Sequence, residues 1–348
     1  MRMRRCIYPG LLLLLTSFCH AQDPVSFNRN DRAKQIDVSI GGQFFTSLIY
    51  PDSLPKPVLF PVTTSNGTRI TRGFPITPMP GDPTDHPHHI GLWLTYENVN
   101  GIDFWNNSSA IPDSQLSHYG SIRLDSIMSV KGGDTGVITY HANWVDHARR
   151  KLLEELTTFR FSGRGSLRII DRLTRLTAAT DVTLNDAKDG LLGIRVIPQL
   201  QLPDTAQRTY KDAHGNVTVV KKPAAIHPTG NYLTSEGKTG NDAWGSRASW
   251  CKLFGKVDQD SVAIVIIDHP GNPNYPTFWH ARDYGLFAAN PLGEKIFTNG
   301  KSKLDLQLKA GSSAVFLFRI VITDGQRTPT PAVIAAMAAD FATRQFSW

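Results

Sequence analysis

Short segments in which apolar and polar residues alternate dominate this chain of 348 residues. A period of two is typical of strands with one buried face. The segments are rich in branched and aromatic residues, and most are bounded by Gly, Pro, Asn or Asp, which favour turns. They span residues 35–40, 44–50, 136–144, 155–161, 166–173, 191–201, 262–268 and 314–322. The pattern predicts an all-β fold that is mostly antiparallel, either as one large β domain or as two fused sandwiches.

Helical signals are few, and the clearest lies at the C-terminal end. Apolar residues recur at helical spacing from Pro331 to Phe346, after a helix-compatible start at Thr330-Pro331. This predicts a short C-terminal helix that packs on a sheet edge or sandwich end. A polar stretch over residues 202–239, with a hairpin turn at 212–216, predicts a surface insertion or lid. No internal repeat is present, so we expect one domain over residues 22–348.

The first 21 residues are organised like a secretory signal peptide. Three arginines precede an apolar run, Leu11–Leu15, which is too short to span a membrane. We expect cleavage after Ala21; the alternative is a lipid on Cys19. No later segment has eighteen consecutive apolar residues. We therefore expect a secreted, periplasmic protein that is not inserted in a membrane.

Charge and cysteine content exclude several classes of function. Without the leader, 34 basic residues face 30 acidic ones, and the formal charge falls from +7 to +4. No basic stripe interleaved with aromatic residues is present, so nucleic acid is not an expected partner. Cys251 is the one cysteine outside the leader, so we expect no disulfide and no cysteine-based metal site. No cofactor is expected, although a divalent metal is possible.

Residues Asp85-His86-Pro87-His88-His89 place four ionisable side chains in five positions. Imidazole titrates near neutral pH and is the commonest metal ligand, so the cluster indicates proton transfer, metal binding or capture of a polar ligand. If the segment is extended, His86 and His88 share a face and His89 points away. Asp85 and His86 are candidate substrate-binding residues. The alternative is that Asp85 caps the loop and the histidines bond backbone carbonyls.

Two tryptophans follow the histidine cluster. Trp93 and Trp105 either stack on a sugar ring, as substrate-binding residues, or belong to the core.

A second polar cluster runs from Asp268 to Pro291. Its strand pattern places His280 and Arg282 on one face. His280 is a candidate acid or base, and Arg282 either clamps hydroxyl or carboxylate groups or pairs with Asp283 in a structural network. Asn290 is a candidate substrate-binding residue.

Arg195 lies among apolar neighbours in a predicted strand. An inward-facing arginine needs a buried anionic partner or a ligand. Glu154-Glu155 and Asp171-Arg172 lie on candidate core strands, and neutralisation there is slightly favoured over a substrate contact.

Five blocks of this sequence together resemble a family of exported bacterial proteins called PmoA-like. The resemblance covers residues from about 35 to 322, and its blocks are 71–75, 85–93, 99–105, 186–196 and 268–291. It implies a large antiparallel β-sandwich like that of aldose mutarotases and some polysaccharide lyases. Members of the family are often encoded beside genes of sugar oxidation and polysaccharide breakdown. The family name refers to a methane oxygenase. We reject methane oxidation, because a membrane subunit of that kind needs several spanning helices.

We therefore predict an exported carbohydrate-active enzyme that transfers protons at a sugar carbon or anomeric centre, as in epimerisation, mutarotation or β-elimination. His88 and His280 are the predicted acid–base pair, and Arg282 is predicted to stabilise developing negative charge. Two alternatives stay open. One is a metal-dependent hydrolase or lyase in which His86, His88 and His280 hold a divalent ion. The other is a non-catalytic sugar-binding protein.

Overall fold

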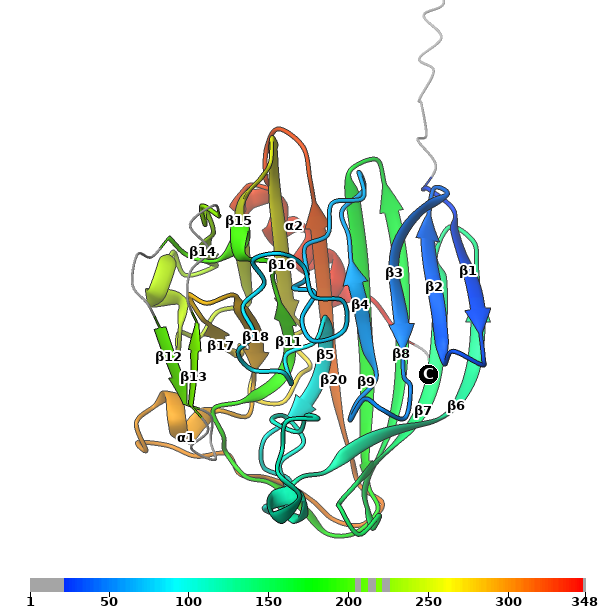
Figure 1. Cartoon of the computed structure of the whole chain (residues 1–348), viewed down its shortest axis with the longest axis vertical. Helices are drawn as coiled ribbons and strands as arrows, with labels where there is room; N and C mark the ends of the chain where they lie inside the picture. The colour runs from blue at the N-terminus through cyan, green and yellow to red at the C-terminus, as the bar shows by residue number, and fades with distance from the viewer. Residues whose placement is uncertain (1–21, 204–207, 212–216, 221–225, 347–348) are drawn as a thin grey trace, which may run out of the picture.

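Two eight-stranded antiparallel sheets form the body of the protein (Figure 1). The computed structural model describes residues 22–203, 208–211, 217–220 and 226–346; the expected leader and the turn at 212–216 lie outside these ranges. The first sheet has the order β1-β2-β3-β4-β5-β11-β18-β17. These strands are β1 Val25–Asn30, β2 Gln35–Ile40, β3 Gln43–Ile49, β4 Val58–Val62, β5 Leu92–Tyr96, β11 Gly190–Arg195, β18 Leu286–Asn290 and β17 Phe278–Ala281.

The second sheet has the order β14-β15-β16-β20-β9-β8-β7-β6. Its strands are β14 Asn231–Thr234, β15 Trp250–Val257, β16 Asp260–Asp268, β20 Ser313–Thr323, β9 Leu167–Ala178, β8 Lys151–Arg164, β7 Gly136–Val145 and β6 Ser121–Lys131. Two small ribbons pair β10 (Val182–Leu184) with β19 (Leu306–Leu308) and β12 (Arg208–Lys211) with β13 (Val217–Val220). Short helical segments are η1 Asp113–His118, η2 Pro198–Leu200, η3 Gly240–Ala243 and α1 Glu294–Phe297.

The predicted antiparallel β-sandwich with a short C-terminal helix is confirmed. Each of the eight predicted strands has a counterpart, but the one predicted over 191–201 was too long. That strand ends at Arg195, and Pro198, which has no N–H to donate to a sheet, begins η2. The predicted hairpin around residues 212–216 has its two flanking strands, β12 and β13, paired as expected.

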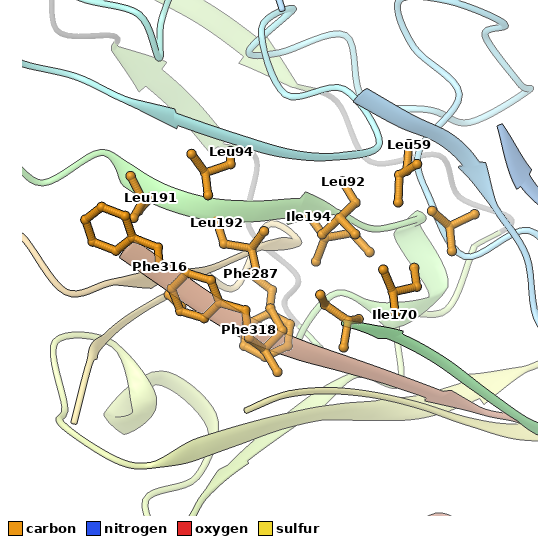
Figure 2. Packing of buried hydrophobic residues seen from close by; sticks show 14 of the residues in the cluster. Leu59, Leu92, Leu94, Ile170, Leu191, Leu192, Ile194, Phe287, Phe316 and Phe318 are labelled. Carbon is orange, nitrogen blue, oxygen red and sulfur yellow. The ribbon is translucent and has the colours of Figure 1, made fainter. Parts of the chain in front are cut away.

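The space between the two sheets is filled by apolar side chains from both (Figure 2). Leu92, Leu94 and Ile194 of the first sheet lie in the same buried cluster as Phe316 and Phe318 of β20. These residues occupy alternate positions of their strands, as a sheet with one core-facing surface requires. The residues between them point to the opposite, outer surface of the first sheet.

Helix α2 (Pro331–Thr343) packs on the outer surface of the second sheet. Ile334 and Phe341 are fully buried there, in a cluster with Val265 and Val321. Thr330 caps the helix by accepting a hydrogen bond from Val333 N, as its position before Pro331 predicts. No helix among the described residues is long and apolar enough to cross a membrane.

A charged group lies within the core of the second sheet. Glu155 accepts hydrogen bonds from the Tyr140 hydroxyl, Trp144 Nε1 and the Thr157 hydroxyl, and forms an ion pair of 2.9 Å with Arg172. Glu155 and Arg172 are 1% and 2% exposed. A buried pair of this kind is stable only while both charges and their hydrogen bonds are kept.

We expect Glu155→Leu to lower the free energy of unfolding by about 3–5 kcal/mol, because it leaves Arg172 buried without its carboxylate. The matched control is Glu154→Leu, which removes the exposed neighbour that pairs with Lys151 and should cost less than about 1 kcal/mol. Urea unfolding of both variants measures the difference, and equal losses would contradict the assignment.

Candidate functional site

The candidate site lies on the outer surface of the first sheet, where four strands bring their outward residues into one row. His280 of β17 is opposite Ala288 of β18, Ala288 is opposite Gly193 of β11, and Gly193 is opposite Trp93 of β5. Directly opposed residues project from the same face of a sheet. Arg195, two positions from Gly193, shares that face. Sequence segments nearly 190 positions apart thus meet on one surface.

The histidine segment before β5 is a turn. His89 N donates to His86 O at 3.0 Å, and His86 has a left-handed backbone with φ of 43°. The expectation of an extended segment, with His89 pointing away from the other two, is therefore wrong, because a turn brings all three rings together. The ring centres of His86 and His89 are 4.8 Å apart and nearly parallel, and His88 meets His89 edge-on at 4.3 Å.

Asp85 anchors this turn to the sheet. Its two carboxylate oxygens accept hydrogen bonds from Arg195 at 2.9 and 2.8 Å, and one also contacts Arg72 at 3.3 Å. Asp85, Arg72 and Arg195 are all fully buried. The expected neutralisation of Arg195 on the core strands is wrong, because its side chain points to the outer surface while Glu155 pairs with Arg172 inside. The anionic partner of Arg195 is therefore Asp85, and no substrate group is needed to neutralise its charge.

The guanidinium of Arg72 fixes the backbone of the same turn. It donates to the carbonyl oxygens of Pro83, Asp85, His86 and His89. Burial alone would raise the pKa of Asp85, but Arg195, followed by His86 and Arg72, holds it below its usual range. Asp85 thus stays a carboxylate throughout the neutral range.

His86 Nδ1 lies 2.5 Å from the second carboxylate oxygen of Asp85. The carboxylate must accept this hydrogen bond, so Nδ1 carries a proton and Nε2 is the nitrogen that can accept one. The His86 side chain is 13% exposed, whereas His88 and His89 are 3% and 1% exposed. Burial lowers the pKa of His86 and Asp85 opposes that change; burial lowers the pKa of His88 and His89 much further. His86 is the accessible imidazole of the cluster.

Trp93 and Trp105 are both fully buried, so the core alternative holds for them and a sugar cannot stack on either ring in this structure. Their ring centres are 5.1 Å apart, and Trp93 stacks on His89 at 5.3 Å. Both rings lie close to Gly193, where an added Cβ would come within 2.8 Å of Trp93 and 2.9 Å of Trp105. Both indoles contact the His89 ring and so support the histidine turn.

A buried amine, which sequence reasoning missed, lies beside this aromatic group. Lys56 is 1% exposed, its Nζ donates to the Trp105 carbonyl at 3.2 Å, and the same atom is 5.2 Å from the centre of the Trp93 ring. Burial lowers the pKa of Lys56 to about 7, and Asp103 partly opposes the change. No local pattern around Lys56 predicts this, because the groups that its amine contacts, Trp93 and Trp105, lie far along the chain.

Replacing Lys56 by Met should stabilise the protein at pH 7. In the wild type, the unfolded chain keeps the proton up to pH 10.5 and the folded chain loses it near 7, so wild-type stability rises by about 1.4 kcal/mol per pH unit between these values. We expect Lys56→Met to gain about 1–3 kcal/mol at pH 7, and the gain to shrink at pH 9. Urea unfolding at both pH values measures it. Lys151→Met, at an exposed position, is the control. A Lys56→Met variant less stable than the wild type at pH 7 would contradict the conclusion that burial of this amine costs stability.

His280 lies at the other end of the row. Its Nδ1 is 3.0 Å from the carbonyl oxygen of Lys188 and 3.4 Å from a carboxylate oxygen of Asp189. Burial lowers the pKa of His280 to about 4, although Asp189 raises it. Glu97 accepts from the backbone N–H of Asp189, and burial, with the charge of Asp189, raises the pKa of Glu97 to about 7. Glu97 and His280 both contact Asp189, so two groups with shifted pKa values lie beside this residue.

The depressed pKa of His280 gives stability a definite dependence on pH. Between pH 6.5 and about 4 the unfolded imidazole binds a proton and the folded one does not, so this residue makes stability fall as the pH falls. We expect His280→Gln to reduce that slope by up to about 1.4 kcal/mol per pH unit relative to the wild type. Urea unfolding at pH 5 and pH 7 measures the change. The exposed substitution His118→Gln is the control, and parallel slopes for wild type and His280→Gln would refute the prediction.

Asn290 is a structural residue and not the predicted substrate ligand. It is fully buried, its Nδ2 donates to the carbonyls of Ala187 and Lys188, and its Oδ1 accepts from Leu292 N. Its amide is therefore committed to the chain. It holds in place the same Lys188 carbonyl that binds His280.

Arg282 lines a cavity of about 210 Å³ at the edge of this surface, together with Asn241, Trp244, Ala281 and Asp283. Its guanidinium carbon is 5.5 Å from the ring centres of both Trp244 and Tyr284. Tyr284 in turn stacks on His86 at 5.1 Å. Trp244 is 41% exposed, so it offers the open aromatic face that Trp93 and Trp105 lack. Sequence reasoning missed Trp244 and Tyr284.

Contacts thus connect the two histidine groups through Tyr284 and Arg282. Burial is the main cause of the low pKa of His280, and the charges of Lys188 and Arg282 lower it further. Arg282 therefore lies near His280 as well as near Tyr284. No hydrogen bond or ring contact joins His88 to His280 within the ranges that the structure describes. The pairing of His88 with His280 stays a prediction, and His86 is linked to Arg282 through the Tyr284 ring, on which it stacks.

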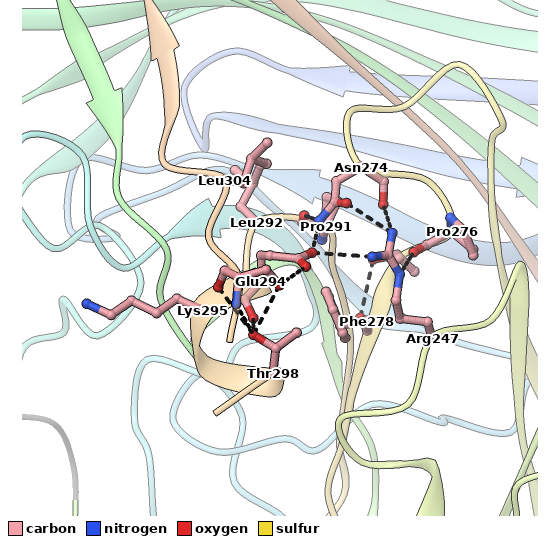
Figure 3. Close-up of polar contacts among 12 residues, drawn as sticks. Arg247, Asn274, Pro276, Phe278, Pro291, Leu292, Glu294, Lys295, Thr298 and Leu304 are labelled. Carbon is pink, nitrogen blue, oxygen red and sulfur yellow. Dashed lines mark hydrogen bonds and ion pairs between the residues drawn. The ribbon is translucent and has the colours of Figure 1, made fainter. Parts of the chain in front are cut away.

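A polar network fixes the loop that enters β17 (Figure 3). Arg247 donates to the carbonyls of Pro276 and Asn274 and forms an ion pair of 3.3 Å with Glu294. The Asn274 amide donates to Glu294 as well, and the Arg247 guanidinium lies 4.7 Å from the Phe278 ring centre. The network sets the position of β17 and therefore of His280 and Arg282.

The metal alternative is wrong for the predicted ligands. Among the described residues, no three His, Cys, Asp or Glu side chains are arranged to hold a metal ion. The physical reason is separation, because His280 lies on β17, three strands away from β5, while His86 and His88 lie in the turn just before β5.

Comparisons with known proteins give a family and remote structural similarities. A family model described as a family of unknown function, DUF6807, matches residues 35–339. A comparison with curated protein sequences found no match. Among solved structures, an α-galactosidase from Geobacillus stearothermophilus is similar with a TM-score of 0.39 and 12% identity over 87% of this chain and 41% of that one.

Two smaller proteins are similar over nearly their whole length. A galactose mutarotase-like protein from Clostridium acetobutylicum has a TM-score of 0.39 and 10% identity over 87% of this chain and 98% of that chain. A galactose mutarotase related enzyme from Lactobacillus acidophilus has a TM-score of 0.32 and 8% identity, with the same coverage.

Proposed function

The chain belongs to the family DUF6807, and for this member we propose a carbohydrate-active enzyme that transfers protons at a sugar carbon or anomeric centre. The observation that carries the proposal is the Asp85–His86 pair, a buried carboxylate that orients a partly exposed imidazole. This arrangement suits general acid–base catalysis, because the carboxylate fixes the tautomer in which Nε2 is the nitrogen that accepts a proton.

In the proposed reaction, His86 Nε2 takes a proton from the sugar and gives it to a ring or leaving-group oxygen, or back to the same carbon after the planar intermediate has turned its other face to the imidazole. Asp85 remains ionised, because Arg195 and Arg72 hold its pKa low, and it stabilises the imidazolium that forms. The cycle is redox-neutral and its protons balance. It gives epimerisation or mutarotation when the proton returns, and β-elimination when a leaving group departs.

The surroundings of His86 suit a sugar. Tyr284 stacks on its ring, and Arg282 extends from Tyr284 to the cavity with Trp244. An exposed indole covers the apolar face of a sugar ring, and a guanidinium without a carboxylate partner within the described residues can stabilise negative charge on a ring oxygen. Arg282 keeps the role that the sequence predicts, while His86 takes the one predicted for His88.

We expect His86→Gln to lower turnover by at least 100-fold, because the amide can still donate to Asp85 but cannot accept the proton. Deuterium incorporation from D₂O, followed by NMR with aldohexoses, uronates and 3-keto sugars, reports proton transfer at carbon. Polarimetry reports exchange at the anomeric centre. His141→Gln, on the second sheet, is the matched control and should leave both rates unchanged.

Equal rates for His86→Gln and wild type would exclude His86 as the base. A wild-type protein that binds a sugar without turning it over, and whose binding survives His86→Gln, would support the non-catalytic alternative. We also propose that the protein is exported to the periplasm and that it is related to the PmoA-like proteins. Mass spectrometry of the secreted chain tests the cleavage expected after Ala21.

A further inference from the structure

A larger cavity lies away from the histidine turn, at the end of the strands β6 and β7. Its volume is about 930 Å³. Loops after β3 and β5, the segment η1 and the turn after β7 complete its walls. This volume is in the range of pockets that enclose a small-molecule ligand. The site proposed above uses none of the residues that line it.

Hydroxyl and amide groups line much of this cavity. Arg123 of β6 is directly opposite Asn143 of β7, so both side chains leave the same face of the second sheet. The Asn143 Oδ1 atom is buried and has no hydrogen-bond partner among the described residues. Buried polar atoms are almost always paired, so this acceptor has an unmet hydrogen bond beside the cavity that the Asn143 side chain lines. The other neutral polar groups are those of Ser53, Asn107, Ser108, Ser109 and Ser121.

The arginines of the cavity are not neutralised by its acids. Its two acids already have partners outside the lining, since Asp52 pairs with Lys34 and Asp146 with Arg150. Arg123 donates to the carbonyls of Asp52 and Leu54 and meets no carboxylate within ion-pair distance among the described residues.

Arg149 adds a second positive charge to the same cavity. It is exposed and forms no ion pair in the part of the chain that the structure describes. Burial, which Asp52 partly offsets, lowers the pKa of Arg123, and the nearby charge of Arg149 lowers it further. Two like charges close together are destabilising unless an anion joins them.

We propose that this cavity binds an anionic saccharide, whose carboxylate or sulfate group pairs with Arg123 and Arg149 and whose hydroxyl groups bond Asn143 and the serines. Arginine presents a planar pair of donors that suits either anionic group. The remaining wall combines serine and asparagine side chains with the two paired acids and with apolar residues such as Leu116 and Val145. The site is independent of catalysis at His86.

The test is isothermal titration calorimetry of the whole chain with digalacturonate, its dimethyl ester and a sulfated galactose disaccharide. The dimethyl ester differs from digalacturonate by its missing charges. We expect at least one acidic disaccharide to bind at least tenfold more tightly than the ester. Arg149→Glu should weaken that binding at least tenfold, and Asn143→Leu should weaken acid and ester alike.

Arg164→Glu makes the same charge change at the far end of β8 and is the matched control. His86→Gln should bind like the wild type, so failure of the proposed catalysis would leave this test intact. Stronger binding of one acid than the other distinguishes carboxylate from sulfate. Equal affinity for acid and ester, no acid binding, or full affinity in Arg149→Glu would overturn the proposal.

Discussion

The burial of Asp85 between two arginines is the interaction on which the candidate site depends. A carboxylate removed from water needs ionic partners, and Arg195 and Arg72 supply them from β11 and from the loop after β4. The residues from 73 to 91 contain no strand or helix, so few backbone hydrogen bonds hold them. Arg72 replaces these with four side-chain bonds to carbonyls of this loop. The place of the His86 ring is thus tied to an ion cluster and not to a regular element.

The same charges decide the protonation of the site. Arg72 and Arg195 are fixed cations in a buried environment, and burial disfavours a further positive charge. The pKa of each of the three neighbouring histidines is lowered, first by burial, and these arginines contribute to each. The imidazoles are therefore neutral at pH 7 and able to accept a proton. Lys56 follows the same rule, with its pKa lowered to about 7.

Much of the fold could be predicted because strand signals are local. The alternation over residues 35–40 is β2 itself, and Thr330-Pro331 marks the start of α2. The site was predicted only in part. The histidines and Arg282 were identified by their chemistry, but Trp93 and Trp105 gave the same signal whether buried or exposed. Lys56, Trp244 and Tyr284 carry no pattern at all, since their roles come from neighbours distant in the chain.

The sequence by itself determined the strands, the helix, the all-β class and the types of side chain available for chemistry. Those properties depend on the spacing of apolar residues along the chain and on residues a few positions apart. Only the tertiary structure decided that Asp85 pairs with Arg195, that His86 faces Tyr284, and that Arg123 and Arg149 share a cavity. These are contacts between strands and loops far apart in sequence, and pairing, burial and charge neutralisation select them together once the two sheets have packed.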